Sequence, residues 1–196
     1  DCTNTIELLA QPEMSEMARN VYHRLTSHYN DDRFGFGLVN DKVFNGAELY
    51  PNMRDTRIKN KYIFLFHSLR HPDPNTSLIE LYLTIDALAR ASVRGVTLVL
   101  PHICYFRQDR KDKPRVPISG KAIADLLTLK PIVDRVITFD MHADQEQGFF
   151  NIPVDNLPGA YVLANYYRGV YGEDFKNVVA VSPDRGSWKR IKRFAE

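Results

Sequence analysis

The feature that most constrains the fold of this 196-residue sequence is its alternation between short apolar runs and longer segments with helical periodicity. The strand-length runs lie at residues 6–10, 62–66, 96–100 and 135–139. After each run, apolar residues recur every three or four positions, as on one face of a helix. Strands that alternate with helices of ten or more residues form parallel sheets. The sequence therefore predicts an α/β fold, a mostly parallel sheet with helices on both faces.

The remaining pattern predicts further elements. Helices are expected at residues 12–29, 78–89, 119–129 and 160–167, with a last one from about Ser187. Ser77 and Glu80 have the spacing of a capping box, and the two prolines in 71–75 indicate a loop. Residues 34–39 and 43–50 are predicted to pair as a hairpin, because Asn-Asp and Asn-Gly pairs favour turns. Residues 178–181 are predicted to form a last strand.

Composition narrows the class of protein. Hydrophobic residues make up 44% and charged residues 26% of the chain, and the net charge is +2. These values are typical of a soluble globular protein and argue against a general nucleic-acid binder. No apolar run has membrane-spanning length, and no leader pattern begins the chain. Cys2 and Cys104 have no disulfide or metal-ligand spacing, so we expect a reduced, cytoplasmic protein without nucleic-acid or membrane partners.

Polar residues in such a fold gather where parallel strands end. The segment after residue 100 holds five basic and two acidic residues between Arg107 and Arg115. Guanidinium groups bind phosphate oxygens in pairs, so this loop is a candidate polyphosphate site. A solvated charged loop, or a basic patch for RNA, remains an alternative at this level.

Two more strand ends carry possible metal ligands. Asp140 and His142 would project to one face of an extended segment, where they suit a divalent metal or a proton relay. Asp184 lies in a turn of small residues between a predicted strand and a helix. Simple helix capping by Asp184 or Ser187 is the alternative for this third segment.

These three segments together resemble the ribose-phosphate diphosphokinase family, also called phosphoribosyl pyrophosphate synthetase. One match is YFRQDRKDKPRVPIS at residues 105–119. Another is DMHADQEQGFFNIPVDNL at residues 140–157, which is similar to the family signature from its Asp-x-His to its closing Pro-x-Asp. Weaker similarity extends from about Phe44 to the end of the chain, whereas the first forty residues are similar only in pattern.

The resemblance implies a reaction and its site. MgATP would donate its β,γ-diphosphoryl group to the 1-hydroxyl of ribose 5-phosphate, giving phosphoribosyl pyrophosphate and AMP. ATP contacts are implied for Phe44, Glu48, Arg107, Gln108, Asp109 and Arg110. Mg²⁺ is the implied cofactor, with metal positions at His142, Asp184, Asp140 and Asp155. The resemblance also implies a homo-oligomer in which the Phe44 loop reaches the ATP site of a neighbouring subunit.

The sequence departs from the family pattern at three positions. Gly46 stands where the nucleotide loop Phe-x-Asp-Gly-Glu has its Asp, which removes one hydrogen-bond acceptor. Donors on a buried base that lose a partner would cost roughly 1–3 kcal/mol. Asn151 stands where members usually have Asp, and Arg185 adds charge to a turn of small residues. These changes leave base selectivity and ATP affinity open.

The resemblance assigns residues 1–156 to an N-terminal ATP- and metal-binding domain. Residues 157–196 would begin a C-terminal, phosphoribosyltransferase-like domain. The family's catalytic Lys/Arg loop and its ribose 5-phosphate loop are expected beyond Glu196, so no catalytic residue is assigned and the chain alone is expected to be inactive. The alternative function is that of a non-catalytic regulatory homologue that associates with an active synthetase. An RNA-binding module is disfavoured because the basic loop lacks interleaved aromatics.

Overall fold

The chain forms two compact units, residues 1–156 (unit 1) and residues 157–196 (unit 2). The computed structural model describes residues 5–70, 73–186 and 188–195. Within those ranges, every helix is too short or too polar to cross a lipid bilayer.

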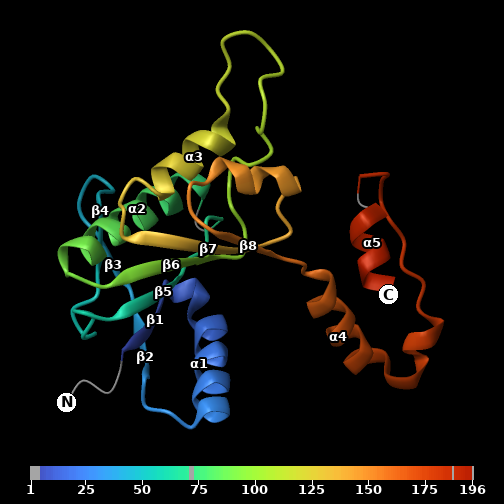
Figure 1. Cartoon of the computed structure of the whole chain (residues 1–196), viewed down its shortest axis with the longest axis horizontal. Coiled ribbons are helices and arrows are strands. Elements are labelled where there is room, and N and C mark those ends of the chain that lie inside the picture. Colours follow the sequence, from blue (N-terminus) through green and yellow to red (C-terminus); the bar gives the residue numbers. More distant parts are fainter. Residues whose placement is uncertain (1–4, 71–72, 187, 196) are drawn as a thin grey trace. The chain divides into compact units, whose positions relative to one another are not determined.

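Unit 1 is built on a six-stranded sheet with the strand order β2-β1-β5-β6-β7-β8 (Figure 1). All four strand pairs between β2 and β7 are parallel, which confirms the predicted α/β class. The strands are β1 Ile6–Ala10, β2 Phe34–Leu38, β5 Tyr62–Phe66, β6 Gly95–Leu100, β7 Val133–Phe139 and β8 Val154–Leu157.

The strands form because their apolar side chains are buried on both faces of the sheet. Successive side chains of a strand point to opposite faces, so neighbouring apolar residues enter different cores. Leu9 and Leu65 join the larger core, whereas Leu8 and Phe66 join the smaller one. Covering both faces requires helices on both sides, which explains the continuous apolar runs in the sequence.

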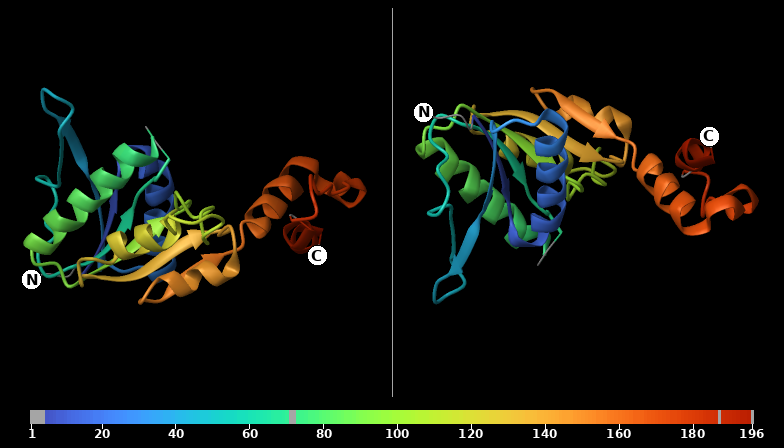
Figure 2. Two further views of the ribbon diagram at one scale, coloured as in Figure 1. Left: turned by 90° about the horizontal axis from the view of Figure 1, so that it is seen from above. Right: turned by 90° about the horizontal axis from the view of Figure 1, so that it is seen from below.

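Three helices cover the two faces. Helix α1 (Ser15–Tyr29), preceded by the 3₁₀ turn η1 (Pro12–Met14), packs on the smaller core through Met14, Ala18 and partly buried residues. Helices α2 (Pro74–Arg90) and α3 (Ser119–Leu127) pack on the larger core, on the opposite face (Figure 2).

The start of α2 differs from the prediction. The carboxylate of Asp73 accepts hydrogen bonds from the backbone N–H groups of Asn75 and Thr76, at 2.9 and 3.1 Å, and therefore caps the helix. Pro74 occupies the first turn, where its missing N–H costs nothing. The predicted capping box of Ser77 and Glu80 is wrong, because both residues lie inside the helix and are buried.

Helix α3 begins at Ser119, as predicted. Ile118 at its N-cap position makes no side-chain hydrogen bond.

The predicted hairpin exists with a different partner. Strand β3 (Asn40–Val43) pairs antiparallel with β4 (Leu49–Asn52) around the Asn45-Gly46 turn, whereas residues 34–38 form β2 of the main sheet. The two-stranded hairpin stands away from the sheet as a separate finger (Figure 2). The predicted pairing of 34–39 with 43–50 is wrong because residues 34–38 pair with β1 and pack their apolar side chains, partly buried, against the smaller core.

Unit 2 is mostly helical. It contains α4 (Ala160–Tyr171), the 3₁₀ segment η3 (Gly172–Asn177) and α5 (Trp188–Ala195). The strand predicted at 178–181 is not formed, and Val179 and Val181 are 81% and 76% exposed. A strand needs a neighbour for its backbone hydrogen bonds, and the described residues of unit 2 contain no other strand that could provide them. The start of the last helix at Ser187 lies outside the described residues.

Candidate functional site

The carboxyl edge of the sheet collects four chain segments. The parallel strands β1, β5, β6 and β7 end at Ala10, Phe66, Leu100 and Phe139, so the residues that follow them lie along one edge. Helix α1 and helix α2 return the chain to the opposite edge. The carboxyl edge is therefore where the polar segments predicted after residues 100 and 139 come together.

A buried polar pair fixes the β1 and β5 end of this edge. Gln11 donates its side-chain amide to both oxygens of Glu80, at 3.1 and 2.9 Å, and accepts from the backbone N–H of Ser68 at 3.0 Å. His67 is fully buried, with Nε2 3.6 Å from Glu80 Oε1. These contacts join β1, the loop after β5 and helix α2.

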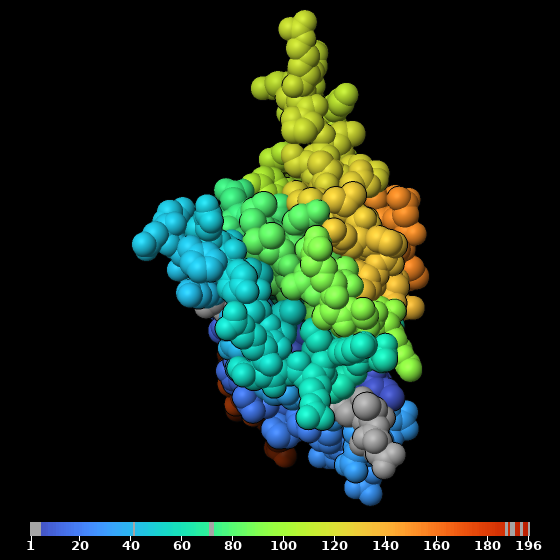
Figure 3. All heavy atoms as spheres, turned by 90° about the vertical axis from the view of Figure 1, so that its left-hand side faces the viewer, coloured from blue at the N-terminus to red at the C-terminus, as the bar shows by residue number. Residues whose placement is uncertain are grey.

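The loop between β6 and α3 projects from the body of unit 1 (Figures 1 and 3). Its base is anchored by Phe106, which is buried and stacks on Phe150 with ring centres 5.8 Å apart. The carbonyl of Gln108 accepts from the backbone N–H of Gly120 at 3.2 Å, and its side-chain oxygen accepts from the Ser119 hydroxyl. The first part of the loop is thus tied to the start of α3.

The predicted phosphate-binding residues stand on this anchored base or just beyond it. Arg107, Gln108 and Arg110 are exposed, and Asp109 is partly buried. Their backbone is held while their side chains remain accessible, which is the arrangement that a preformed anion site requires.

The segment after β7 turns sharply. Asp140 has φ 43°, in the left-handed region, and the backbone N–H of Met141 donates to the side chain of Asn156 at 3.1 Å. Asn156 in turn donates to Asp144 at 3.3 Å. Asp140 and His142 therefore do not share a face of an extended segment as predicted, because the chain is not extended at Asp140. Both residues are nevertheless exposed at this edge.

Glu146 is a residue of this edge that the sequence reasoning missed. It is fully buried in η2 (Asp144–Phe149), and neither carboxylate oxygen has a hydrogen-bond partner among the described residues. Burial raises the pKa of Glu146. The backbone amide of Ala143 and a positive charge on His142 oppose this rise in pKa, and the charge of Asp109 adds to it.

Because Glu146 interacts electrostatically with both Asp109 and His142, two of the predicted segments meet around it.

Asp155 is engaged elsewhere. Its carboxylate accepts from Arg135 Nη1 at 2.8 Å, across β8 and β7, and this pair raises the pKa of Arg135. Asp155 is thus paired with a cation of its own, which weakens its case as a metal ligand. Asn151 is exposed in the turn between η2 and β8.

Phe44 and Glu48 lie at the tip of the β3–β4 hairpin. The backbone N–H of Phe44 donates to the carbonyl of Glu48 at 2.9 Å, and the Phe44 ring packs against Tyr50 with centres 5.4 Å apart. Both residues are exposed, Phe44 by 43%. The tip of the hairpin projects from unit 1, whereas β4 packs against α2, so the tip lies apart from the segments that follow β6 and β7 (Figure 2).

Asp184 belongs to unit 2. It is exposed in a bend, and its carbonyl accepts from the Ser182 hydroxyl at 2.6 Å. Arg185 and Gly186 follow it and are also exposed.

The fit to a magnesium ion depends on waters and phosphate oxygens. Among residues 5–70, 73–186 and 188–195, no group of three His, Cys, Asp or Glu side chains is arranged to hold a metal. Mg²⁺ commonly takes only one or two protein carboxylates and completes its shell with water and substrate phosphates. The exposed His142 and Asp140 fit that type of site, together with the buried carboxylate of Glu146, which has no hydrogen-bond partner among the described residues.

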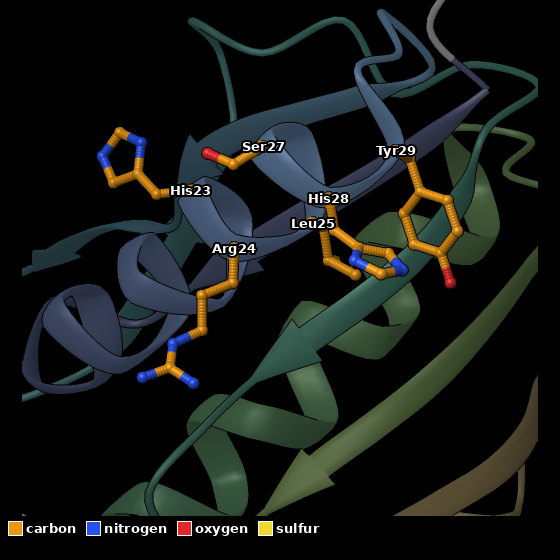
Figure 4. Close-up of a pocket in the computed structure, with 6 residues that line it drawn as sticks. All are labelled: His23, Arg24, Leu25, Ser27, His28 and Tyr29. Atoms are coloured by element: carbon orange, nitrogen blue, oxygen red, sulfur yellow. The ribbon is translucent and has the colours of Figure 1, made fainter.

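An open surface hollow lies elsewhere in unit 1. It has a volume of about 660 Å³ and is lined by a single segment of α1: His23, Arg24, Leu25, Ser27, His28 and Tyr29 (Figure 4). This C-terminal end of α1 leads to the start of β2, so it lies towards the amino edge of the sheet. The hollow is open and has no carboxylate in its lining, and we do not assign it to the chemistry of the carboxyl edge.

The fold and the carboxyl edge define an α/β protein with charged segments gathered where its parallel strands end. The model of the N-terminal domain of ribose phosphate pyrophosphokinase matches residues 6–130. The chain belongs to this family, which confirms the resemblance seen in the sequence. The match begins at Ile6, so the first forty residues share more than a pattern with the family.

Relatives and a solved structure agree with this assignment. The chain is 43% identical over 162 residues to ribose-phosphate pyrophosphokinase 1 of Streptococcus pneumoniae, covering 82% of this chain and 48% of that protein. It is 44% identical over 194 residues to the ribose-phosphate pyrophosphokinase of Clostridium perfringens, covering 99% and 58%.

The crystal structure of phosphoribosylpyrophosphate synthetase from Mycobacterium smegmatis is similar with a TM-score of 0.78 and 31% identity, over 98% of this chain and 60% of that one. The chain spans about half the length of the curated relatives it matches.

Proposed function

We propose that this chain is part of an enzyme that transfers the diphosphoryl group of ATP to the 1-hydroxyl of ribose 5-phosphate, giving phosphoribosyl pyrophosphate and AMP. The proposal rests on one observation. Arg107, Asp109 and His142 lie at the same carboxyl edge of the sheet, in a chain whose fold and sequence belong to the family. In this proposal, unit 1 is the ATP- and metal-binding domain and unit 2 begins the phosphoribosyltransferase-like domain.

The residues at the edge suit a nucleotide triphosphate. The guanidinium groups of Arg107 and Arg110 can each pair with phosphate oxygens, and Gln108 can donate its amide N–H. Its side-chain oxygen is already taken by Ser119, which orients that amide. These groups would bind and align the triphosphate, and in-line alignment with charge neutralisation is what phosphoryl transfer demands.

His142 would hold the magnesium of MgATP, with Asp140 as a neighbouring oxygen donor. Asp184 and Asp155 are the other proposed metal positions, and Asp155 would first have to leave Arg135. When bound, magnesium supplies positive charge that offsets the charge on the phosphates.

The exposed hairpin supports the proposal of a homo-oligomer. Phe44 offers a ring for adenine to stack on, and Glu48 offers an acceptor for its amino group. Both stand on a finger that projects from unit 1, so a second copy could receive them at its own carboxyl edge.

The reaction is tested by measuring AMP release in the full-length product of the gene, with MgATP and with or without ribose 5-phosphate. AMP that appears only when ribose 5-phosphate is present supports the proposal. The His142→Ala variant should lose most of this activity, whereas His28→Ala, on the outer surface of α1, should retain it. If no AMP release depends on ribose 5-phosphate, the proposal is wrong.

A non-catalytic regulatory homologue is the second candidate, and the hairpin tip favours it. Gly46 contributes no side-chain acceptor where the family nucleotide loop has Asp, and it adopts φ 93°. Calorimetry with MgATP separates the two candidates. Micromolar binding, lost in the Arg107→Ala variant, favours the enzyme, whereas no binding at millimolar MgATP together with co-purification with an active synthetase favours the regulatory homologue.

A further inference from the structure

Two basic residues without an assigned role stand beside Arg107 at the carboxyl edge. Arg70 lies on the loop after β5, and His102 lies just beyond β6. These strands are neighbours, and the backbone N–H of His67 donates to the carbonyl of Val99 at 3.1 Å. Arg70 and His102 each follow this bond by three residues, so the two loops leave the sheet side by side.

The backbone around each basic residue is held by a buried neighbour. Leu69, next to Arg70, is fully buried, and Ile103, next to His102, is 6% exposed. Phe106, next to Arg107, is 4% exposed. The three basic residues themselves are exposed, so fixed backbone presents their side chains to solvent.

Further contacts fix each of the two loops separately. The Tyr105 hydroxyl donates to the side chain of Asn75, which links the β6 loop to the start of α2. On the other side, Gln11 accepts from the N–H of Ser68 and so fixes the start of the β5 loop. Ser68 and Tyr105 are therefore held in place before any ligand binds, which limits the conformational entropy that binding beside them would cost.

The three basic groups are close enough to affect one another. Burial lowers the pKa of His102, and the positive charges of Arg70 and then Arg107 lower that pKa further. Among the described residues, none of the three side chains forms an ion pair or a side-chain hydrogen bond. A cluster of three basic groups that has no carboxylate partner in the described part of the chain is complementary to an anion.

We propose that Arg70 and His102 form, together with Arg107, a binding site for the phosphate groups of a polyphosphate, namely the triphosphate of ATP. This inference deepens the proposed function and rests on it for the identity of the nucleotide. Arg70 supplies a guanidinium fork that matches phosphate oxygens, and His102 supplies an N–H donor in either protonation state. The site extends the nucleotide site from the loop at Arg107 across to β5.

The test uses calorimetry on the 196-residue chain with three probes: inorganic tripolyphosphate, MgATP and adenosine. The variant Arg70→Met keeps much of the side-chain length and removes the charge. Arg94→Met is the matched control, because Arg94 is also exposed and also without an ion pair among the described residues, but lies just before β6 at the amino edge. His102→Phe removes the second donor.

The proposal predicts that the substitutions weaken binding only of ligands that carry phosphate groups. Arg70→Met should weaken binding of tripolyphosphate and MgATP about tenfold, the size expected for one charge-assisted hydrogen bond at an exposed site. His102→Phe should weaken both about threefold, and Arg94→Met should change neither. Adenosine binding should be the same in all four proteins. Circular dichroism of each variant checks that the fold is retained.

Two results would overturn the inference. In the first, the Arg70→Met variant binds both phosphate ligands as tightly as the unmodified chain or as tightly as the Arg94→Met variant. The other is an unmodified chain that binds no tripolyphosphate at millimolar concentration.

The same measurements distinguish a failure of the Arg70 and His102 site from a failure of the proposed function. Tripolyphosphate binding that depends on Arg70, without MgATP binding, retains the phosphate site and removes the nucleotide function. MgATP binding that is indifferent to Arg70 does the opposite.

Discussion

Unit 1 and unit 2 differ in how far they bury their apolar side chains. In unit 1, helix α2 buries Leu81, Ile85 and Leu88 almost completely against the sheet. In unit 2, helix α4 buries only Ala160 and Ala164, and its larger apolar residues are exposed. The exposed group comprises Tyr161, Val162, Leu163, Tyr166, Tyr167, Val170 and Tyr171, followed by Val178, Val179, Val181 and Trp188.

The difference lies in the sheet rather than in the helices. Both α2 and α4 are amphipathic, but only α2 packs on a sheet whose strands are paired along their length. A helix gains most of its stability from burying its apolar face rather than from intrinsic propensity. Substitutions in unit 1 should therefore change the free energy of unfolding much more than equivalent substitutions in unit 2.

The largest effect should come from truncating a side chain of the larger core. Leu81→Ala should lower the free energy of unfolding by about 3 kcal/mol, because it leaves a cavity under α2. Leu163→Ala, in unit 2, removes the same atoms from a side chain that is 53% exposed and should cost less than about 0.5 kcal/mol. Urea denaturation followed by circular dichroism measures both, and equal losses would contradict the comparison.

The next largest effect concerns the buried polar pair at the carboxyl edge. Gln11→Leu should cost about 2 kcal/mol, because the buried carboxylate of Glu80 loses two hydrogen bonds and Ser68 N–H loses its acceptor. Gln145→Leu, at an exposed position of η2, is the control and should change stability by less than about 0.5 kcal/mol. A harmless Gln11→Leu would mean that water replaces the amide.

At Glu146, by contrast, a substitution is expected to raise the free energy of unfolding, and the size of this effect depends on pH. Burial raises the pKa of Glu146 above its ordinary 4.5, so the folded state holds the proton more tightly than the unfolded state. This group therefore makes the protein more stable as pH falls from above the raised pKa towards 4.5. Glu146→Gln should raise the free energy of unfolding by about 1 kcal/mol above that window and flatten the dependence within it.

Thermal melts at a series of pH values test this expectation. The control is Glu173→Gln, an exposed carboxylate of unit 2, whose melting profile should follow that of the unmodified chain. A Glu146→Gln variant that is less stable than the unmodified chain at high pH would show that the carboxylate has a partner.

The smallest effect should come from the hairpin, the part of unit 1 whose exposure resembles that of unit 2. Ala47 has φ 65°, a backbone conformation that favours glycine. Ala47→Gly should therefore stabilise the hairpin by about 0.5–1 kcal/mol. Ala122→Gly, on an exposed position of helix α3, should destabilise by about 1 kcal/mol, so chemical denaturation should give the two substitutions opposite signs.

The strands of the main sheet could be predicted from the sequence because they are buried on both faces. A continuous apolar run such as residues 62–66 has few other structures open to it. The hairpin partner could not be predicted, because turn residues indicate where the chain reverses but not which strand packs in the sheet. The strand predicted at residues 178–181 is wrong for a different reason: an apolar run becomes a strand only where another strand pairs with it.

The site was partly predictable for a related reason. Arg107, Asp109 and His142 follow strand ends, and topology alone brings such segments to one edge. Glu146 could not be predicted as a member of this edge, because its importance comes from burial without a partner. Asp155 shows that spacing does not reveal a competing cation such as Arg135, which lies twenty positions away in the sequence but beside it in the sheet.

Gln11 has one consequence for how this part of the chain can vary. Its backbone N–H makes the last bond of β1 to Phe66, at 3.0 Å, and its side-chain oxygen then accepts from Ser68 as a further strand residue would. The chain can therefore turn into η1 at Pro12 without leaving Ser68 unpaired. A carboxamide accepts from Ser68 through its oxygen and donates to both oxygens of Glu80 through its nitrogen, and Asn is one methylene shorter. Position 11 should thus tolerate almost no drift in evolution unless Glu80 changes with it.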